Sequence, residues 1–132
     1  MIKISDLFFQ IQLAEIWEDP ADENGGCRLS VAGESKRIDG ESWEPRFYWE
    51  YVPLTVSNLA SLTTETLEWD AERISSMEAP PMLFVFEHLM LSSGRLCLKR
   101  LNENFVSLSL EGTCDVFLES ISQVFQLLWR RN

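Results

Sequence analysis

Alternation of apolar and polar residues constrains the fold of this chain more than any other feature. Residues 7–14, 27–32 and 105–111 place apolar side chains at every second position, and the first two of these predicted strands extend to about Trp17 and Ile38. Because successive side chains of a β-strand point to opposite faces, this period of two is typical of strands with one buried face. Residues 46–52 follow the same pattern, with Phe47, Trp49 and Tyr51 on one face, and Pro53 ends the segment. The sequence therefore predicts a strand-rich body.

The second half of the chain predicts three strands joined by short turns. Residues 82–91 are apolar on both faces, which is typical of a strand inside a sheet. Turn residues at 92–94 and 102–104 separate this segment from strands at 95–101 and 105–111. In the last strand Val106, Leu108 and Leu110 are predicted to face the core.

Two segments show helical periodicity instead. In residues 57–75, Ala60, Leu67, Ala71 and Ile74 fall within an arc of about 60° on a helical projection, and Ser57 is a suitable N-cap. Residues 115–131 follow the N-cap Asp115 and carry a second apolar stripe. The stripe of this C-terminal helix consists of Phe117, Ile121, Val124 and Leu128.

These elements predict a single α+β domain over residues 1–132. It contains a mainly antiparallel sheet of about six strands and two helices, in the order βββαβββα. The segment 82–91 is expected inside the sheet, with the C-terminal helix packed on one face. The two βββα halves are compatible with a duplication, although no residue-level similarity supports one.

Cysteine usage and hydropathy predict a cytoplasmic protein. The three cysteines, Cys27, Cys97 and Cys114, are far apart in the chain and are expected to be small core residues rather than disulfide partners. No apolar run approaches the ~18–20 residues of a membrane span, and the first residues lack the apolar stretch of a signal peptide.

The net charge of −10 limits the classes of partner. Residues 1–80 hold 16 acidic and 6 basic residues, whereas residues 81–132 hold 5 of each. Nucleic acids and anionic membranes are excluded as direct partners, because both require clustered Lys and Arg. A localised acidic surface favours a basic protein partner.

No motif for catalysis or cofactor binding is found in the sequence. His88 is the single histidine and lies in an apolar segment, where a core or edge position is expected. Phosphate-binding glycine loops are absent, and the acidic loop of residues 18–24 lacks the ligand spacing of an EF-hand. We expect no enzymatic activity, no cofactor and no bound metal.

The predicted helix at 57–75 carries the candidate partner-binding residues. Three glutamates lie beside its core stripe, and Leu62 and Trp69 lie on the far side, either as an interface anchor or as a second core contact. The acidic loop at 18–24 is a second part of the same candidate surface. The predicted binding residues are Asp19, Asp22, Glu23, Glu65, Glu68, Trp69 and Glu72.

In size, charge and strand-rich body, with acidic residues gathered in EDPADEN (18–24) and ETLEWDAE (65–72), the chain resembles immunity proteins of bacterial polymorphic and contact-dependent growth inhibition systems. The resemblance implies a toxin inhibitor that neutralises a cognate, basic, nuclease-type toxin domain by covering its substrate surface. It also implies a monomer, or a 1:1 complex with the toxin.

Two other functions fit the sequence. Chaperones of type III secretion systems are also small and acidic with mixed α/β folds, but they usually begin with a helix, and this chain is predicted to begin with a strand. A small ligand-binding or enzymatic α+β domain is the third reading, because carboxylates and aromatic residues on a sheet can line a pocket.

Overall fold

A computed structural model describes residues 2–4, 7–18, 27–54, 59–77, 79–85, 88–113 and 123–129. Over these ranges the chain is mostly β, with one short 3-10 helix, η1 (Leu59–Ser61), and one four-residue helix, α1 (Ala71–Ile74). The strands are β1 (Ile2–Ile4), β2 (Leu7–Phe9), β3 (Ile11–Glu18), β4 (Cys27–Gly33), β5 (Lys36–Ile38), β6 (Glu41–Trp43), β7 (Arg46–Val52), β8 (Thr64–Trp69), β9 (Met82–Phe84), β10 (His88–Met90), β11 (Ser93–Arg100), β12 (Phe105–Thr113) and β13 (Gln123–Trp129).

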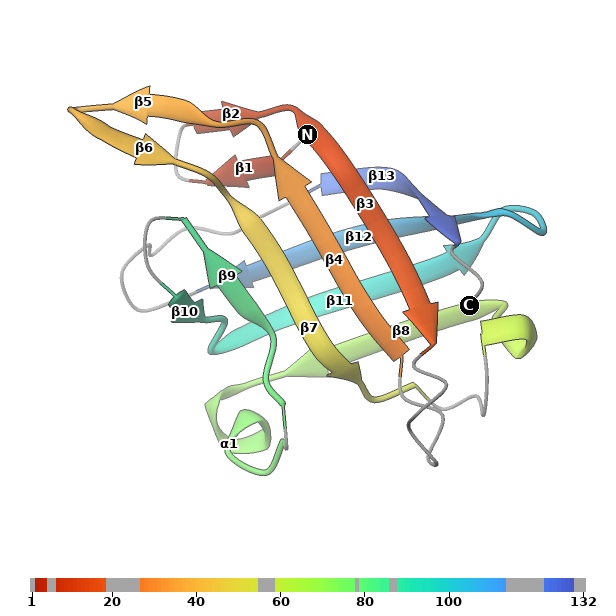
Figure 1. Ribbon diagram of the computed structural model, residues 1–132. Coiled ribbons are helices and arrows are strands. Elements are labelled where there is room, and N and C mark those ends of the chain that lie inside the picture. Colours follow the sequence, from red (N-terminus) through yellow and green to blue (C-terminus); the bar gives the residue numbers. More distant parts are fainter. Residues whose placement is uncertain are drawn as a thin grey trace.

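Nine of these strands form one sheet that folds over on itself. Its order is β10-β9-β7-β4-β3-β13-β12-β11-β8. In Figure 1 the front layer of β9, β7, β4 and β3 crosses the back layer of β13, β12, β11 and β8 at a large angle. The sheet passes from one layer to the other at β3 and β13, which pair in parallel, whereas the other described strand pairs are antiparallel. The hairpins β1–β2 and β5–β6 lie at one end.

The core lies between the two layers, where alternate residues of each strand face inward. Trp49 of β7 meets Trp69 of β8 edge to face, with ring centroids 5.0 Å apart. Both indole N–H groups are satisfied, since Trp69 Nε1 donates to the Leu91 carbonyl at 2.9 Å and Trp49 Nε1 to that of Ala79 at 3.0 Å. The front layer also contributes Ile16, Leu29, Val31, Phe47 and Leu83, and the back layer Leu67, Leu96, Leu98, Val106, Leu108 and Leu110.

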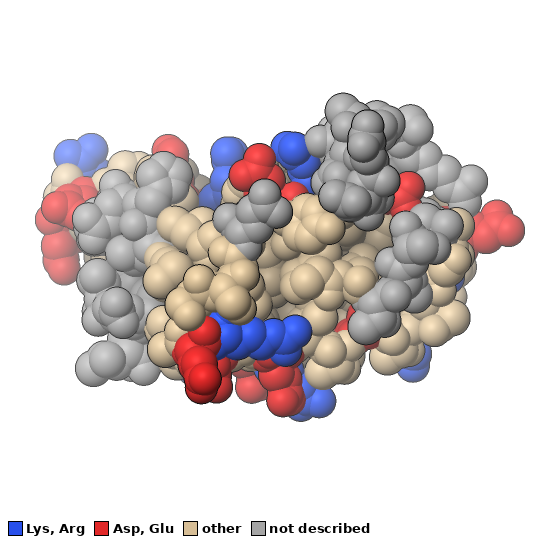
Figure 2. All heavy atoms as spheres, turned by 90° about the horizontal axis from the view of Figure 1, so that it is seen from below, with Lys and Arg blue, Asp and Glu red and all other residues tan. Residues whose placement is uncertain are grey.

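Charged side chains lie mainly outside this core. Seen from below in Figure 2, uncharged side chains fill the centre of the end of the sandwich, and Asp, Glu, Lys and Arg gather along its borders. Glu65 is the exception among the described residues, because it is buried at 6% exposure. Among the described residues, the charged groups that can meet a partner therefore lie on the outward faces and hairpins.

The predicted α+β class with two helices is wrong, because the described chain is mostly strand. Residues 57–75 contain η1, β8 and α1 rather than one amphipathic helix. Within 64–69, Leu67 and Trp69 share the inward face while Thr64, Thr66 and Glu68 point outward. The period of two was present, and β-branched threonines favour it, but the apolar residues also fitted a helical arc. Pairing of β8 with β11 decided between the two patterns.

The predicted C-terminal helix at 115–131 is also wrong. Residues 123–129, including Val124 and Leu128 of the predicted stripe, form strand β13. Phe117 and Ile121 lie outside the described residues. This strand pairs with β12 on one side and β3 on the other, so it joins the two layers. Backbone pairing with two distant strands overrides a local helical pattern of this kind.

The predicted central strand at 82–91 is two short strands at the edge of the sheet. β9 and β10 pair with each other as a hairpin, and β10 is terminal in the strand order. Leu83 faces the core, whereas Met82 and Phe84 lie on the outward side, half-buried. The two-sided apolar pattern therefore reflects an apolar outward face and not a central position.

Other predicted strands are confirmed. β7 spans the predicted residues 46–52, and β11 and β12 cover the predicted strands at 95–101 and 105–111 to within two residues. Val106, Leu108 and Leu110 are buried as predicted. Segment 7–17 is divided into β2 and β3, and segment 27–38 into β4 and β5. The single-domain prediction over residues 1–132 stays a prediction.

Candidate functional site

The outward face of the front layer carries two rows of aligned side chains. Register across β3, β4, β7 and β9 follows from the antiparallel pairing of these strands. One row is Leu13, Ala32, Arg46 and Phe84, and the next is Glu15, Ser30, Tyr48 and Met82. Leu13 is 49% exposed. Large apolar side chains thus lie on the outward face of the front layer, away from the core.

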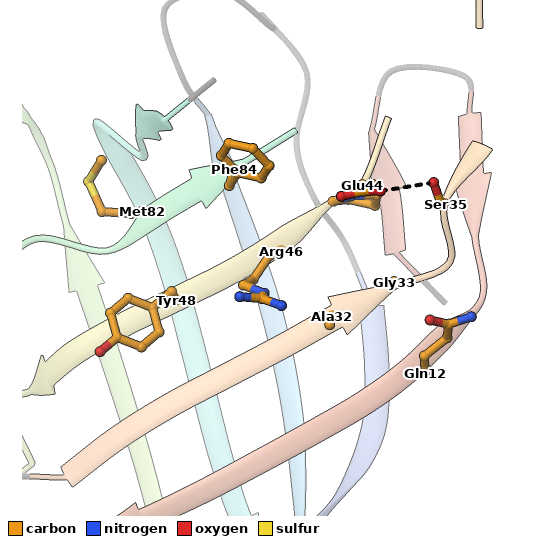
Figure 3. A pocket seen from close by; sticks show the side chains of 10 residues that line it. Gln12, Ala32, Gly33, Ser35, Glu44, Arg46, Tyr48, Met82 and Phe84 are labelled. Atoms are coloured by element: carbon orange, nitrogen blue, oxygen red, sulfur yellow. Dashed lines mark hydrogen bonds between the residues drawn. The ribbon is translucent and has the colours of Figure 1, made fainter. Parts of the chain in front are cut away.

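A groove of about 600 Å³ opens on this face. Its walls are mainly apolar, and Figure 3 shows the side chains of Tyr48, Met82 and Phe84 along one side, on β7 and β9. The other side and the end of the groove are formed by β3, β4 and the base of the β5–β6 hairpin. The lining residues are Gln12, Ala32, Gly33, Ser35, Glu44, Pro45, Arg46, Tyr48, Met82 and Phe84.

Arg46 supplies the cation of the groove. It is exposed, and its guanidinium lies toward β4, beside Ala32, its neighbour in the strand register (Figure 3). No carboxylate of the described residues lies within ion-pair distance of it. A guanidinium offers several N–H donors in a planar array that matches a carboxylate, sulfonate or phosphate.

Glu44 supplies the negative charge at the far end of the groove. It accepts a hydrogen bond from the Ser35 hydroxyl at 3.4 Å, drawn as a dashed line in Figure 3. Its backbone N–H donates to the carbonyl of Val85, the residue after β9, at 3.0 Å. This bond connects the end of the groove to β9. The groove therefore has opposite charges at two separate places.

Close packing at Gly33 holds the base of the groove. The Gly33 N–H donates to the Pro45 carbonyl at 2.8 Å. A Cβ at this position would lie 3.0 Å from Pro45 Cγ and 3.1 Å from Ile2 Cδ1, so a side chain would push β1 and Pro45 away. The glycine brings Pro45, which is buried, close against β4.

The outward face of the back layer is mainly polar over β8, β11 and β12, with Phe105 at the start of β12 as an exposed apolar residue. Thr64, Thr66 and Glu68 of β8 lie beside Lys99, Cys97 and Arg95 of β11, and Ser107, Ser109 and Glu111 of β12 continue the rows. Arg95 pairs with Glu68 at 3.3 Å, and the Thr66 hydroxyl donates to Cys97 Sγ at 3.6 Å. Short polar side chains and an exposed ion pair make this a solvated surface.

The structure does not bring the predicted binding residues together as one row. Glu65 and Trp69 face the core, at 6% and 5% exposure, so of the two roles left open for Trp69 the core contact is the one observed. Glu68 points outward from β8, and Glu72 is exposed on α1. The other three predicted residues, Asp19, Asp22 and Glu23, lie outside the described residues.

Glu68 and Glu72 nevertheless remain exposed at one corner, with Asp70 between them in sequence. Asp70 is the N-cap of α1, and its carboxylate accepts from the Arg73 N–H at 2.8 Å. Arg73 Nη1 donates to the Glu68 carbonyl at 2.6 Å. These contacts hold the carboxylates on an ordered turn, which we call the β8–α1 corner (residues 68–73).

Among the titratable groups that the structure describes, Cys27 and Glu34 have perturbed pKa values. Burial, reinforced by the nearby charge of Glu18, raises the pKa of Cys27 from 9.0 to about 12. A hydrogen bond from the Gln10 N–H lowers the pKa of Glu34, helped by Lys36, against a smaller opposing effect of desolvation. Cys27 is a free core thiol, as the sequence predicted. Cys97 is also free, but it is half-buried on the outward face of β11, so its predicted core position is wrong. Cys114 lies outside the described residues.

Over the same ranges the structure contains neither a metal-binding cluster nor a membrane-spanning helix. No cluster of three or more His, Cys, Asp or Glu side chains suited to a metal ion occurs among the described residues. His88 lies in β10, and its side chain falls outside the description. None of the described helices has the length and apolar character required to cross a membrane.

Comparison with known proteins adds no relative. No family model, curated protein sequence or solved structure matches this chain.

Sequence reasoning missed the groove. The signal was available in the apolar residues that lie on the opposite strand face from the buried Phe47, Trp49 and Leu83, namely Tyr48, Met82 and Phe84. Each was interpreted within its own segment. Only the strand register shows that they lie on one outward face.

Proposed function

We propose that this chain is a cytoplasmic protein-binding inhibitor of the immunity type, which neutralises a cognate basic toxin domain by occupying its substrate surface. The observation that carries the proposal is the charge distribution. The net charge is −10, and the whole excess falls in residues 1–80, which include the β8–α1 corner. Inhibition of this kind requires occupancy and no catalysis.

The β8–α1 corner is suited to a basic partner by its geometry. Glu68, Asp70 and Glu72 are exposed there, and capping of α1 fixes the backbone that carries them. Ordered carboxylates stand in for phosphates at lower entropic cost than a flexible acidic tail would. Because Glu68 already pairs with Arg95, Glu72 is the carboxylate most open to a cation of the partner.

The experiment first searches the genes next to the one for this protein for a basic toxin domain, and then measures the association of the two proteins. Charge reversal by Glu72→Lys should slow association by about tenfold at low salt, with little change in the dissociation rate. Glu68→Lys should have a smaller effect, because the partner must displace Arg95. Both differences should shrink as salt shortens the Debye length from about 30 Å at 0.01 M to about 8 Å at 0.15 M.

The matched control is Glu103→Lys, at an exposed position in the β11–β12 turn, within the part of the chain that has no net charge. It makes the same charge change and should leave the association rate within about twofold of the parent. An association rate that ignores both salt and the Glu72 reversal contradicts the acidic-surface proposal. Failure of the protein to protect cells from that toxin contradicts inhibition itself.

A further inference from the structure

The groove on the front layer has the dimensions of a small-molecule site. Its volume of about 600 Å³ lies inside the range of about 300–1,000 Å³ that is usual for ligand pockets. It is bounded by β3, β4, β7 and β9 and closed at one end by the base of the β5–β6 hairpin. A ligand would lie across the strands, above the Ala32–Arg46–Phe84 row.

The walls select an apolar or aromatic body. Tyr48, Met82 and Phe84 are half-buried and point away from the core, so part of their apolar surface faces the groove. Their packing contributes nothing to the inner core, which Phe47, Trp49 and Leu83 of the same strands already fill. A ligand that covers this apolar surface removes it from water, which favours binding.

Arg46 selects a negative charge on that body. It is an exposed guanidinium in the apolar groove, with no described carboxylate in ion-pair range, in a chain whose net charge is −10. Arg28 and Arg95, in contrast, each pair with a glutamate on their own face. A planar anion can accept two parallel hydrogen bonds from such a group.

We propose that the groove binds a small organic anion, a single carboxylate or sulfonate on an aromatic or apolar body, with the charge on Arg46 and the body against Tyr48, Met82 and Phe84. Glu44 at the far end repels a second negative charge, so the site prefers monoanions to dianions. The site is separate from the β8–α1 corner, because the groove is on the front layer and β8 belongs to the back layer.

A matched pair of fluorescent probes tests the proposal. The anionic probe is 8-anilinonaphthalene-1-sulfonate, and N-phenyl-1-naphthylamine is the same ring system without the sulfonate. Titration of the folded protein should show saturable binding of one sulfonate probe per chain, tighter than binding of the uncharged probe. Near-ultraviolet circular dichroism on each sample establishes that the probe reports a folded protein.

Three variants locate the site and separate charge from packing. Arg46→Met should lower the affinity for the sulfonate probe at least about tenfold and change the affinity for the uncharged probe by no more than about twofold. Phe84→Ala should lower the affinity for both probes, since both contain the same ring system. Glu44→Gln should raise the affinity for the sulfonate probe about twofold to fivefold, because it removes from the groove a charge of the same sign as the probe.

The matched control is Lys99→Met, which removes an exposed cation from the outward face of the back layer. Should Lys99→Met weaken the sulfonate probe as much as Arg46→Met, binding follows overall charge and the proposal fails. It also fails if Arg46→Met leaves the affinity unchanged, or if several probes bind per chain without saturation. Arg46→Gln repeats the test if the methionine variant does not fold.

Discussion

The two layers of this protein have equivalent inward faces and different outward faces. Inward, both present Leu, Ile, Val, Phe or Trp at alternate positions, and these side chains are buried. Outward, the back layer carries short polar and charged side chains on β8, β11 and β12. The front layer instead carries Leu13, Tyr48, Met82 and Phe84 around Arg46.

This difference separates what the fold requires from what it does not. Each layer of a two-layer sheet needs one apolar face for the core, and its other face is normally polar and solvated. The back layer follows this rule. The apolar residues of the front face contribute to no inner contact, and contiguous exposed apolar surface often marks a binding site. We therefore assign the groove a role in binding and the back face a role in solubility.

The largest expected effect tests the contact that joins the layers. Trp69→Ala should destabilise the protein by about 3–5 kcal/mol, because it removes a buried indole and leaves the Leu91 carbonyl without its donor. Chemical denaturation measures the change. Glu68→Ala, at the next position along β8 but on the outward face, should cost no more than about 0.5 kcal/mol. Equal effects would mean that Trp69 is not a core residue.

Cysteine reactivity compares an inward position of the front layer with an outward position of the back layer. Cys27 is 2% exposed and its pKa is raised to about 12, whereas Cys97 is half-buried on the polar face. Alkylation by iodoacetamide near pH 8 should be at least about a hundredfold slower at Cys27, because thiolate is the reactive form. Peptide mass spectrometry distinguishes the two sites, and similar rates would contradict burial of Cys27.

The same raised pKa gives a direction for pH dependence. Folding keeps Cys27 protonated, so its contribution to stability is complete below pH 9.0 and is lost as pH rises toward about 12. Cys27→Ser should flatten this part of the stability curve. A parent and a variant with the same slope above pH 9.0 would exclude burial as the cause.

Two glycines of the back layer differ in the room beside them. A Cβ at Gly94 would lie 2.6 Å from both the Glu111 carbonyl and Trp69 Cζ2, whereas at Gly112 the nearest atom would be 3.3 Å away. Gly94→Ala should therefore cost about 1–3 kcal/mol through overpacking. Gly112→Ala should cost distinctly less. Thermal unfolding of the two variants gives the comparison, and a reversed order would contradict the position of the Trp69 ring.

The smallest expected effect compares ion pairs on the two outward faces. Arg28 and Glu50 lie 3.8 Å apart on the front, and Arg95 and Glu68 lie 3.3 Å apart on the back. Solvent screens both pairs, so double-mutant cycles should give coupling energies of about 0.5 kcal/mol or less on each face. A coupling above about 1 kcal/mol on one face would show that charge pairing, and not only apolarity, distinguishes the layers.

The sequence by itself determined the strands whose buried face is marked by alternation. In 46–52 and 105–111, Phe47, Trp49, Val106, Leu108 and Leu110 point to one side in any strand, because the side-chain period is a local property of the backbone. Charge is also local information. The sequence therefore predicted the acidic first part of the chain and the exposure of Glu68 and Glu72.

The tertiary structure decided the elements whose pattern fits two periods. Leu67 fits both a helical stripe and a strand face, and pairing of β8 with β11 places it on the strand face beside Trp69. β13 is a strand because β12 and β3 offer backbone partners on both sides. The tertiary structure also decided the groove: its lining residues Ala32, Arg46 and Phe84 are far apart in sequence, and only the strand register aligns them. Hydrogen-bond pairing between distant strands is a property of the whole fold, and no local periodicity encodes which strands will meet.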